Sequence, residues 1–268
     1  MFSNFGLTVR PGRVYGLLGK NGEGKSTLLY LMMGLLRPSM GDVVVDGERS
    51  ACRRSELLGS CFLVPEEFSL PSIPLRDYVK INAPFYKSFS MDDLSRNLQN
   101  FGLDTDVHLG SLSMGEKKKV YMCFALATNT RYLLMDEPTN GLDIPSKAQF
   151  RKVVMGGMSE EKTVIISTHQ VRDVDSLLDH VLMLDNGRVA IDRSVADISE
   201  RLCFKDLSFA ESARHDVLYA QPSAGGNNVV MPRRGGEDET VINLEVLFNA
   251  MLVNPEGVRE ALGSESVR

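Results

Sequence analysis

The sequence predicts an α/β fold built around a parallel β-sheet, and two observations support this prediction. The first is a series of short apolar runs rich in Val, Ile and Leu, at residues 14–18, 43–45, 61–64, 132–135 and 164–167. Nearly continuous apolar runs of this length are typical of strands that are covered on both faces of a sheet. The second is the helical pattern of the segments between them, as at residues 25–36 and 114–128. Strands that alternate with helices are typical of parallel sheets.

A β-hairpin is predicted to close this sheet. Residues 181–184 and 189–191 are apolar and flank the sequence Asp185-Asn186-Gly187-Arg188. Asn-Gly is the strongest short hairpin signal, because both turn residues must accept a positive φ. We therefore expect antiparallel β elements beside the parallel strands.

A helical insertion is predicted between two strands of the core. Residues 70 to about 110 are rich in proline and aromatic side chains, and a helical pattern follows at 91–101. We therefore expect a main domain over residues 1–205, interrupted by a helical insertion over about 70–128. The remaining residues, 206–268, are expected to form a small C-terminal appendage.

The predicted appendage has a pattern of its own. Two turn-rich stretches, at 223–228 and 232–236, flank a short apolar segment at 229–231 that is a candidate strand. Apolar residues at helical spacing predict an amphipathic helix over 243–252.

The composition is that of an ordinary folded protein without a large charge imbalance. The chain has 268 residues, of which 43% are hydrophobic, and a net charge of −5. Without a basic field, the chain is not expected to bind nucleic acid. No apolar run approaches the ~18 residues of a membrane span, and the first residues lack the pattern of a signal peptide. The four cysteines are widely spaced, which predicts reduced thiols in a cytoplasmic protein. Neither a metal site nor a disulfide framework is expected from Cys52, Cys61, Cys123 and Cys203.

A glycine-rich segment at 19–27 matches the phosphate-loop (Walker A) pattern G-x-x-x-x-G-K-[ST]. It follows a predicted strand and opens a predicted helix, which is the context that the pattern requires and which disfavours a glycine-rich turn that binds nothing. Glycines let main-chain N–H groups turn towards phosphate oxygens, and the helix start offers further free N–H groups. Lys25 is expected to reach the β- and γ-phosphates of ATP, and the Ser26 hydroxyl is expected to bind Mg²⁺. The predicted ATP-binding residues are Gly19, Lys20, Asn21, Gly22, Gly24, Lys25, Ser26 and Thr27. The chain is thus expected to have a P-loop NTPase core.

The predicted strand at 132–135 ends in two acidic residues, Asp136 and Glu137. Ligands of open α/β sheets lie beyond the carboxyl ends of the strands, so Asp136 is expected to face the Mg²⁺. Glu137 is expected to act as a general base or to orient the water near the γ-phosphate. Taken alone, this pair is equally well explained as a solvated turn before Pro138, but the phosphate loop upstream favours the catalytic interpretation.

Four further segments carry short motifs, in a fixed order along the chain. They are Leu63-Val64-Pro65-Glu66-Glu67, Leu112-Ser113-Met114-Gly115-Glu116, Pro138-Thr139-Asn140-Gly141-Leu142-Asp143 and Ser167-Thr168-His169-Gln170. Taken alone, the second has the Ser-x-x-Glu form of a helix capping box, and the third is a turn. Together with the phosphate loop and the Asp-Glu strand, they resemble the nucleotide-binding subunit of ATP-binding cassette (ABC) transporters. The resemblance covers about residues 5–205 and favours single-cassette subunits of bacterial export systems, including antibiotic-resistance types.

The resemblance implies that Leu112, Ser113 and Gly115 belong to the family's signature segment, whose common form is LSGGQ. In the family, this segment contacts the γ-phosphate that is bound by the other subunit of a dimer. Met114 and Glu116 depart from the common form, so Ser113 and Gly115 are the residues expected to keep the role.

The resemblance also implies roles for the other motifs. Asp143 would belong to the D-loop, which directly follows the catalytic glutamate, Glu137. His169 matches the family's switch histidine, which contacts the γ-phosphate. Glu66 stands where the family usually has a glutamine that contacts Mg²⁺ or water, so the implied Mg²⁺ ligands are Ser26, Asp136 and Glu66.

One feature of the family is expected to be missing. Its members normally begin with a strand that carries an aromatic residue stacked on adenine, and alignment of residues 5–12 places that residue before Met1. Phe2 and Phe5 are expected to lie in the core and not to take the place of the aromatic residue that stacks on adenine.

ATP and Mg²⁺ are the cofactors that the resemblance implies. The implied partners are a second ABC ATPase subunit, in a homodimer or heterodimer that encloses two ATP molecules, and integral membrane permease subunits. The implied location is cytoplasmic, peripheral on the inner face of the cell membrane, and the implied direction is export. Two alternatives are a soluble ABC-type ATPase that acts on ribosomes or DNA, and a regulatory module that uses the C-terminal tail. A single cassette without sustained heptads argues against the first, and the presence of Glu137 and His169 argues against the second.

Overall fold

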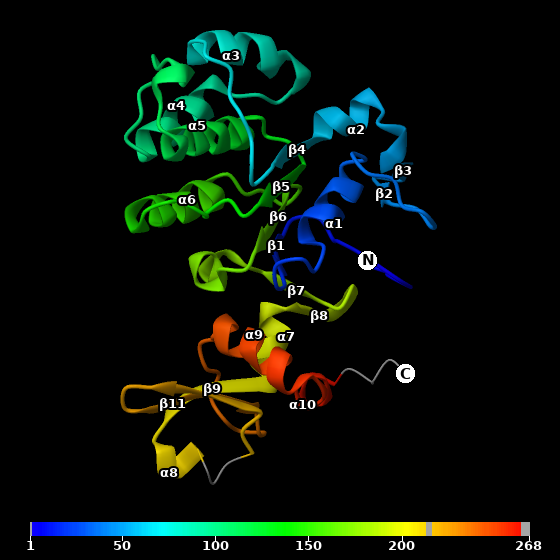
Figure 1. Cartoon of the computed structure of the whole chain (residues 1–268), viewed down its shortest axis with the longest axis vertical. Helices are drawn as coiled ribbons and strands as arrows, with labels where there is room; N and C mark the ends of the chain where they lie inside the picture. The colour runs from blue at the N-terminus through cyan, green and yellow to red at the C-terminus, as the bar shows by residue number, and fades with distance from the viewer. Residues whose placement is uncertain (1, 213–215, 264–268) are drawn as a thin grey trace.

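A six-stranded sheet forms the centre of the molecule in the computed structural model, which describes residues 2–212 and 216–263 (Figure 1). Five neighbouring strands run parallel and the sixth is antiparallel. In spatial order, the strands are β4 (Cys61–Val64), β5 (Tyr132–Asp136), β6 (Thr163–Thr168), β1 (Val14–Leu18), β7 (His180–Asp185) and β8 (Arg188–Ser194). The prediction of an α/β fold with a parallel sheet is confirmed. The hairpin at Asn186-Gly187 is confirmed too, because β7 and β8 pair across it.

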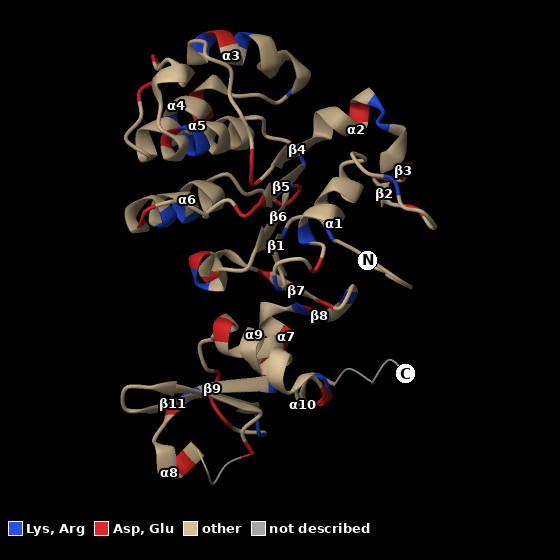
Figure 2. Cartoon of the chain, in the orientation of Figure 1, with Lys and Arg blue, Asp and Glu red and all other residues tan. Residues whose placement is uncertain are grey.

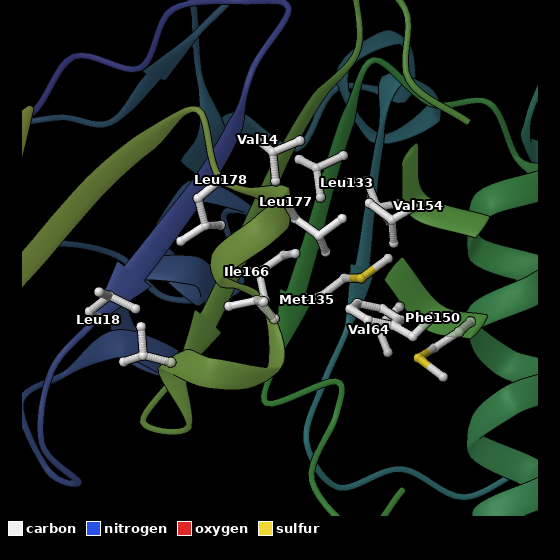
Figure 3. Close-up of a cluster of buried hydrophobic side chains, with 14 of the residues drawn as sticks. Val14, Leu18, Val64, Leu133, Met135, Phe150, Val154, Ile166, Leu177 and Leu178 are labelled. Carbon is white, nitrogen blue, oxygen red and sulfur yellow. The ribbon is translucent and has the colours of Figure 1, made fainter. Parts of the chain in front are cut away.

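The sheet is buried on both faces, as its nearly continuous apolar strands predict. In β1, Val14 and Leu18 belong to one buried cluster, while Tyr15 and Leu17 belong to another. The first cluster includes Phe150 of α6 (Ile144–Gly156), and Figure 3 shows side chains of this helix and of the strands within the cluster. Alternate residues of a strand point to opposite faces, so each strand supplies both clusters.

The helix after the phosphate loop is shorter than the expected 25–36. This helix is α1 (Lys25–Met32), and the chain then turns at Gly34, whose φ is +64°. A Cβ at Gly34 would lie 2.1 Å from the carbonyl oxygen of Ser50. A left-handed glycine therefore ends the helix, because only glycine fits this close approach.

The strand expected at 43–45 is not part of the main sheet. Val44–Val45 (β2) pairs with Glu48–Arg49 (β3) in a separate two-stranded sheet, and Val44 is 57% exposed. Asp46 and Gly47 between them both have positive φ, of +51° and +80°. Asp-Gly is a hairpin turn signal, and it joins β2 and β3 into an exposed hairpin. The prediction of a buried strand at 43–45 was therefore wrong.

Helices cover the sheet beside β4 and β5, within the predicted insertion. They are α3 (Leu75–Asn82), α4 (Met91–Asn100) and α5 (Met114–Ala127), and α2 (Ser55–Ser60) lies just before β4. The capping box predicted at Ser113 and Glu116 is present at the start of α5. Phe124 of α5 packs against Tyr78 and Phe89, so aromatic contacts tie these helices together.

The C-terminal elements form a second, three-stranded antiparallel sheet with helices beside it. Its strands are β10 (Tyr219–Ser223), β11 (Gly226–Pro232) and β9 (Leu202–Leu207), in that spatial order. The helices are α7 (Val195–Arg201), α8 (Phe209–Ser212), α9 (Leu244–Val253) and α10 (Pro255–Ala261). The strand predicted at 229–231 and the helix predicted at 243–252 are confirmed, whereas β9, β10 and α10 were not predicted. Residues 213–215 and 264–268 of the predicted appendage lie outside the described residues.

This C-terminal part packs against the main sheet. Leu244, Leu247 and Met251 of α9 belong to the same buried cluster as the sheet residues. Arg172, in the short 3-10 helix η4 (Val171–Asp173), pairs with Glu245 of α9. The appendage therefore contacts the segment that begins two residues after His169.

Charged residues are spread over the whole molecule, with acidic and basic side chains interspersed (Figure 2). Among the described residues, no helix combines the length and apolar character needed to cross a membrane.

Candidate active site

The loop between β1 and α1 has the backbone geometry of a phosphate-binding loop. Gly22 and Gly24 have φ of +89° and +93°, in the left-handed region that favours glycine. Gly24 is the N-cap residue of α1, and no side chain caps the first turn of this helix. The free N–H groups of that turn, at Lys25 and the residues after it, can therefore bind an anion.

Lys25 is held in the middle of this loop. Its side chain is 7% exposed, and Nζ donates hydrogen bonds to the carbonyl oxygens of Gly19 at 2.9 Å and of Lys20 at 3.2 Å. Burial lowers the pKa of Lys25, and the negative charges of Glu137 and Asp136 oppose this decrease. The ammonium is thus fixed where phosphate oxygens would replace its main-chain partners.

Asp136 lies at the carboxyl end of β5, where that strand pairs with β6. Its partner in the register is Ser167, and the Ser167 hydroxyl donates a hydrogen bond to the Asp136 carboxylate. Asp136 is 2% exposed. The pairing of the two parallel strands therefore fixes this carboxylate beside the phosphate loop.

Glu137 follows directly and has an unusual backbone conformation. Its φ is +44°, a left-handed value that is uncommon for residues other than glycine and that clusters at functional sites. Its N–H donates to the carbonyl oxygen of Ser167 at 3.0 Å. The chain therefore bends sharply at the end of β5 but stays attached to β6.

The Glu137 carboxylate is surrounded by partners that orient it. Oε1 accepts from the main-chain N–H of His169 at 3.0 Å and lies 2.8 Å from His169 Nδ1, while Oε2 accepts from the Thr168 hydroxyl at 3.0 Å. Lys25 Nζ is 3.8 Å from Oε1. A buried carboxylate beside a histidine and a lysine can accept a proton from water or orient that water.

These residues surround a cavity of about 250 Å³. It is lined by Asn21, Gly22, Gly24, Lys25, Ser26, Thr27, Glu66, Asp136 and Glu137. The structure thus brings most of the predicted phosphate-loop residues together with all three predicted Mg²⁺ ligands. Hydroxyl and carboxylate oxygens are the donors that Mg²⁺ prefers, so the residues fit this ion. The described residues hold no cluster of three or more His, Cys, Asp or Glu suited to a metal, so Mg²⁺ would depend on phosphate oxygens and water as well.

Glu66 is held at this cavity by the turn after Glu137. The side-chain amide of Asn140 donates to Glu66 Oε1 at 3.0 Å. The segment after β4 and the turn after β5 are thereby joined at the rim of the site.

The residues predicted to belong to the signature segment and the D-loop do not line this cavity. Ser113 caps α5 through a hydrogen bond from the Glu116 N–H, and Asp143 caps α6 through one from the Ser146 N–H at 3.0 Å. Leu112 is half-buried and Gly115 lies in the first turn of α5. If these residues bind nucleotide, it is not the nucleotide in the cavity of their own chain.

Sequence reasoning missed three residues that support the site. Ser167 and Thr168 orient the two carboxylates, and Lys118 Nζ donates to the carbonyl oxygens of Glu137 at 2.8 Å and Asn140 at 2.9 Å. Polar residues at the end of an apolar strand, next to the Asp-Glu strand, are a signal that could have identified the first two. The burial of Lys118 has no such signal, because it is the middle residue of a run of three lysines.

A larger cavity, of about 1050 Å³, lies at the amino ends of β4, β5 and β6 and is lined by Ser60, Arg131 and Lys162 among others. The phosphate loop and the carboxylates lie at the carboxyl ends of the strands, so this cavity is at the opposite edge of the sheet. It contains none of the motif residues, and the chemistry therefore favours the smaller cavity as the nucleotide site.

Comparisons with known proteins agree with this geometry. Residues 2–140 match a protein family described as ABC transporter. The chain is 30% identical over 189 residues to the bacitracin transport ATP-binding protein BcrA of Bacillus licheniformis, which covers 68% of this chain and 61% of that protein. It is also 30% identical over 214 residues to the ABC transporter ATP-binding protein NatA of Bacillus subtilis, covering 76% of this chain and 85% of that protein.

A solved structure shares the fold. The ATP binding subunit of an ABC transporter superposes with a TM-score of 0.66 and 25% sequence identity, over 74% of this chain and 85% of the other. The similarity thus covers both the sequence motifs and the arrangement of the sheet that carries them.

Proposed function

The chain belongs to the ABC transporter family of ATPases, and on that premise we propose that it binds and hydrolyses ATP to energise a separate membrane permease. The observation that carries the proposal is the Glu137 carboxylate. It is buried beside the phosphate loop and contacts Lys25, Thr168 and His169. Phosphate-binding groups and a candidate base for water thus occur in one cavity.

Each group that faces the cavity has a task in the proposed chemistry. Lys25 and the N–H groups of the phosphate loop would bind the β- and γ-phosphates. Ser26 and Asp136 would hold Mg²⁺, with Glu66 as the third ligand. When bound, Mg²⁺ would supply positive charge next to the phosphates. Glu137, oriented by Thr168, orients or deprotonates the attacking water, and His169 contacts the γ-phosphate.

We further propose that two ATPase subunits close around two ATP molecules. The support is the position of Ser113, Gly115 and Asp143 at exposed helix starts outside the chain's own cavity. Met114 and Ile144 beside them are 65% and 84% exposed. In the proposed dimer, the second subunit would cover these two apolar side chains, which burial from water favours. Release of phosphate then removes an anion shared by both chains, so the pair opens.

The direction proposed for transport is export, from the cytoplasmic face of the cell membrane. The support is the similarity to a protein named for bacitracin transport. The division of the chain into an ATPase domain over 1–205, with an insertion over about 70–128, and an appendage over 206–268 remains a proposal as well.

The deciding experiment is purification of the chain from its native membranes with a mild detergent. We expect a protein with several apolar spans of about 20 residues to co-purify, together with ATPase activity that depends on Mg²⁺. A Lys25→Ala chain expressed in the same cells is the matched control, because it keeps the surface and loses the phosphate contact. Recovery of the chain with ribosomes or DNA, and without a membrane protein, would refute the transport proposal.

A further inference from the structure

One lysine of helix α5 is buried although its neighbours in sequence are not. Lys118 is 7% exposed, whereas Lys117 and Lys119 on the same turn are partly exposed. Removing an ammonium from water is costly unless strong partners replace the water. The position of Lys118 therefore requires an explanation from its contacts.

Those contacts are two carbonyl oxygens of the turn that follows β5. Lys118 Nζ donates to the carbonyl oxygen of Glu137 at 2.8 Å and to that of Asn140 at 2.9 Å. The same turn is closed by the Asn140 N–H, which donates to the Glu137 carbonyl at 3.2 Å. One ammonium therefore joins both ends of the turn and attaches it to α5.

This turn needs support because of its conformation. Glu137 has a φ of +44°, which a residue with a Cβ rarely adopts unless the surroundings enforce it. A change in this φ would turn the Cα–Cβ bond, and with it the carboxylate, away from Thr168 and His169. The Glu137 carbonyl group would turn with the same rotation, and Lys118 donates a hydrogen bond to its oxygen at 2.8 Å.

We propose that Lys118 is a positioning residue for hydrolysis: it fixes the turn after β5, and so keeps the Glu137 carboxylate on Thr168 and His169. Lys118 lies in the second turn of α5, five residues after Ser113. The same lysine thus connects the signature helix to the candidate base of its own chain. This inference rests on the function proposed for Glu137.

The test replaces Lys118 by methionine, which has a similar length but neither charge nor N–H donors. We expect kcat for ATP hydrolysis to fall by about 10²-fold, because small displacements of a catalytic group have effects of this size. KM and the nucleotide affinity measured by calorimetry should change by less than about threefold, since Lys118 does not touch the phosphate loop. A role in folding alone would lower the melting temperature and leave kcat unchanged.

Two more variants complete the test. Lys117→Met is the matched control, because its side chain makes no hydrogen bond or ion pair among the described residues. It should hydrolyse ATP at the wild-type rate. Lys118→Gln keeps two N–H donors and should recover part of the lost kcat. If Lys118→Met fails to fold, Lys118→Leu replaces it in the test, and wild-type kcat in a folded variant without a side-chain donor would overturn the inference.

Glu137→Gln is measured in parallel to separate the two proposals. Loss of hydrolysis in Glu137→Gln together with wild-type kcat in Lys118→Met overturns the inference and leaves the function of Glu137 intact. Wild-type kcat in Glu137→Gln refutes the proposed function itself.

Discussion

Replacement of Glu137 by glutamine separates ATP binding from hydrolysis at this site. The amide has the size of the carboxylate and keeps one oxygen that can accept from the Thr168 hydroxyl or the His169 N–H. It lacks the negative charge, and it cannot take a proton from water. The variant should therefore fold and bind nucleotide but fail in the step that needs a base.

The magnitude follows from what the carboxylate does. General-base catalysis contributes about 10²–10⁴ in rate, which corresponds to roughly 3 to 5 kcal/mol of transition-state free energy. Nucleotide affinity should be retained, because the substitution leaves Lys25 and the glycine-rich loop unchanged. The Glu137 carboxylate is 3.8 Å from Lys25 Nζ and contributes no other contact to the phosphate loop.

The assay measures phosphate release at saturating ATP and Mg²⁺, with nucleotide affinity from calorimetry and the size of the particle from gel filtration with ATP. We expect turnover to fall by the stated factor while affinity is kept, and a dimer to accumulate because ATP is no longer removed. Turnover within about tenfold of the wild type would contradict the role of Glu137, because the loss would be below the range of general-base catalysis.

Two further predictions concern lysines. Lys25→Ala should abolish nucleotide binding, because it removes the only side-chain cation among the described residues that line the smaller cavity. Lys20→Ala, which keeps the main-chain carbonyl, is the control. Tight nucleotide binding by Lys25→Ala in calorimetry would refute the phosphate-loop assignment. Lys162 is 4% exposed, and burial lowers its pKa to about 8 from 10.5. Between pH 8 and 10.5 the unfolded chain binds more protons at Lys162 than the folded chain does, so this group's contribution to stability rises with pH in that window and is least favourable below pH 8. Lys162→Met should therefore raise the free energy of unfolding by up to about 3 kcal/mol at pH 7, with a smaller gain at pH 10. Chemical denaturation of both chains at the two pH values is the measurement, and a gain that does not change with pH would contradict the prediction.

The elements that the sequence predicts well are those fixed by local patterns. The strand at 14–18 matches β1, and the one at 61–64 matches β4, because nearly every residue of each run is buried in one sheet. The tight loop between β1 and α1 was predictable because its backbone has positive φ at Gly22 and Gly24, where glycine is favoured. In each case a short stretch of chain contains the whole physical reason.

The parts that were missed depend on contacts between distant segments. Val44 has the apolar character of a core residue, but no element covers it. Lys118 is one of three consecutive lysines, and only the helix position brings it onto the turn at Glu137 and Asn140. Strand β9 begins at Leu202, inside the segment assigned to the main domain. Its pairing partner, β11, begins at Gly226, so a local pattern could not show that β9 belongs to the C-terminal sheet.

The position of β1 in the sheet has a consequence for the synthesis of the chain. This strand lies between β6 and β7, and Val14 pairs with Val164 and Tyr15 with His180. The ribosome must therefore add ~150 residues, which takes roughly 8 to 30 seconds at typical elongation rates, before β1 gains its first neighbour. The phosphate loop, which directly follows β1, is therefore made long before the two strands that flank β1 in the sheet. A nascent chain that stalls before residue 163 exposes an unpaired apolar strand, which is the kind of segment that chaperones bind.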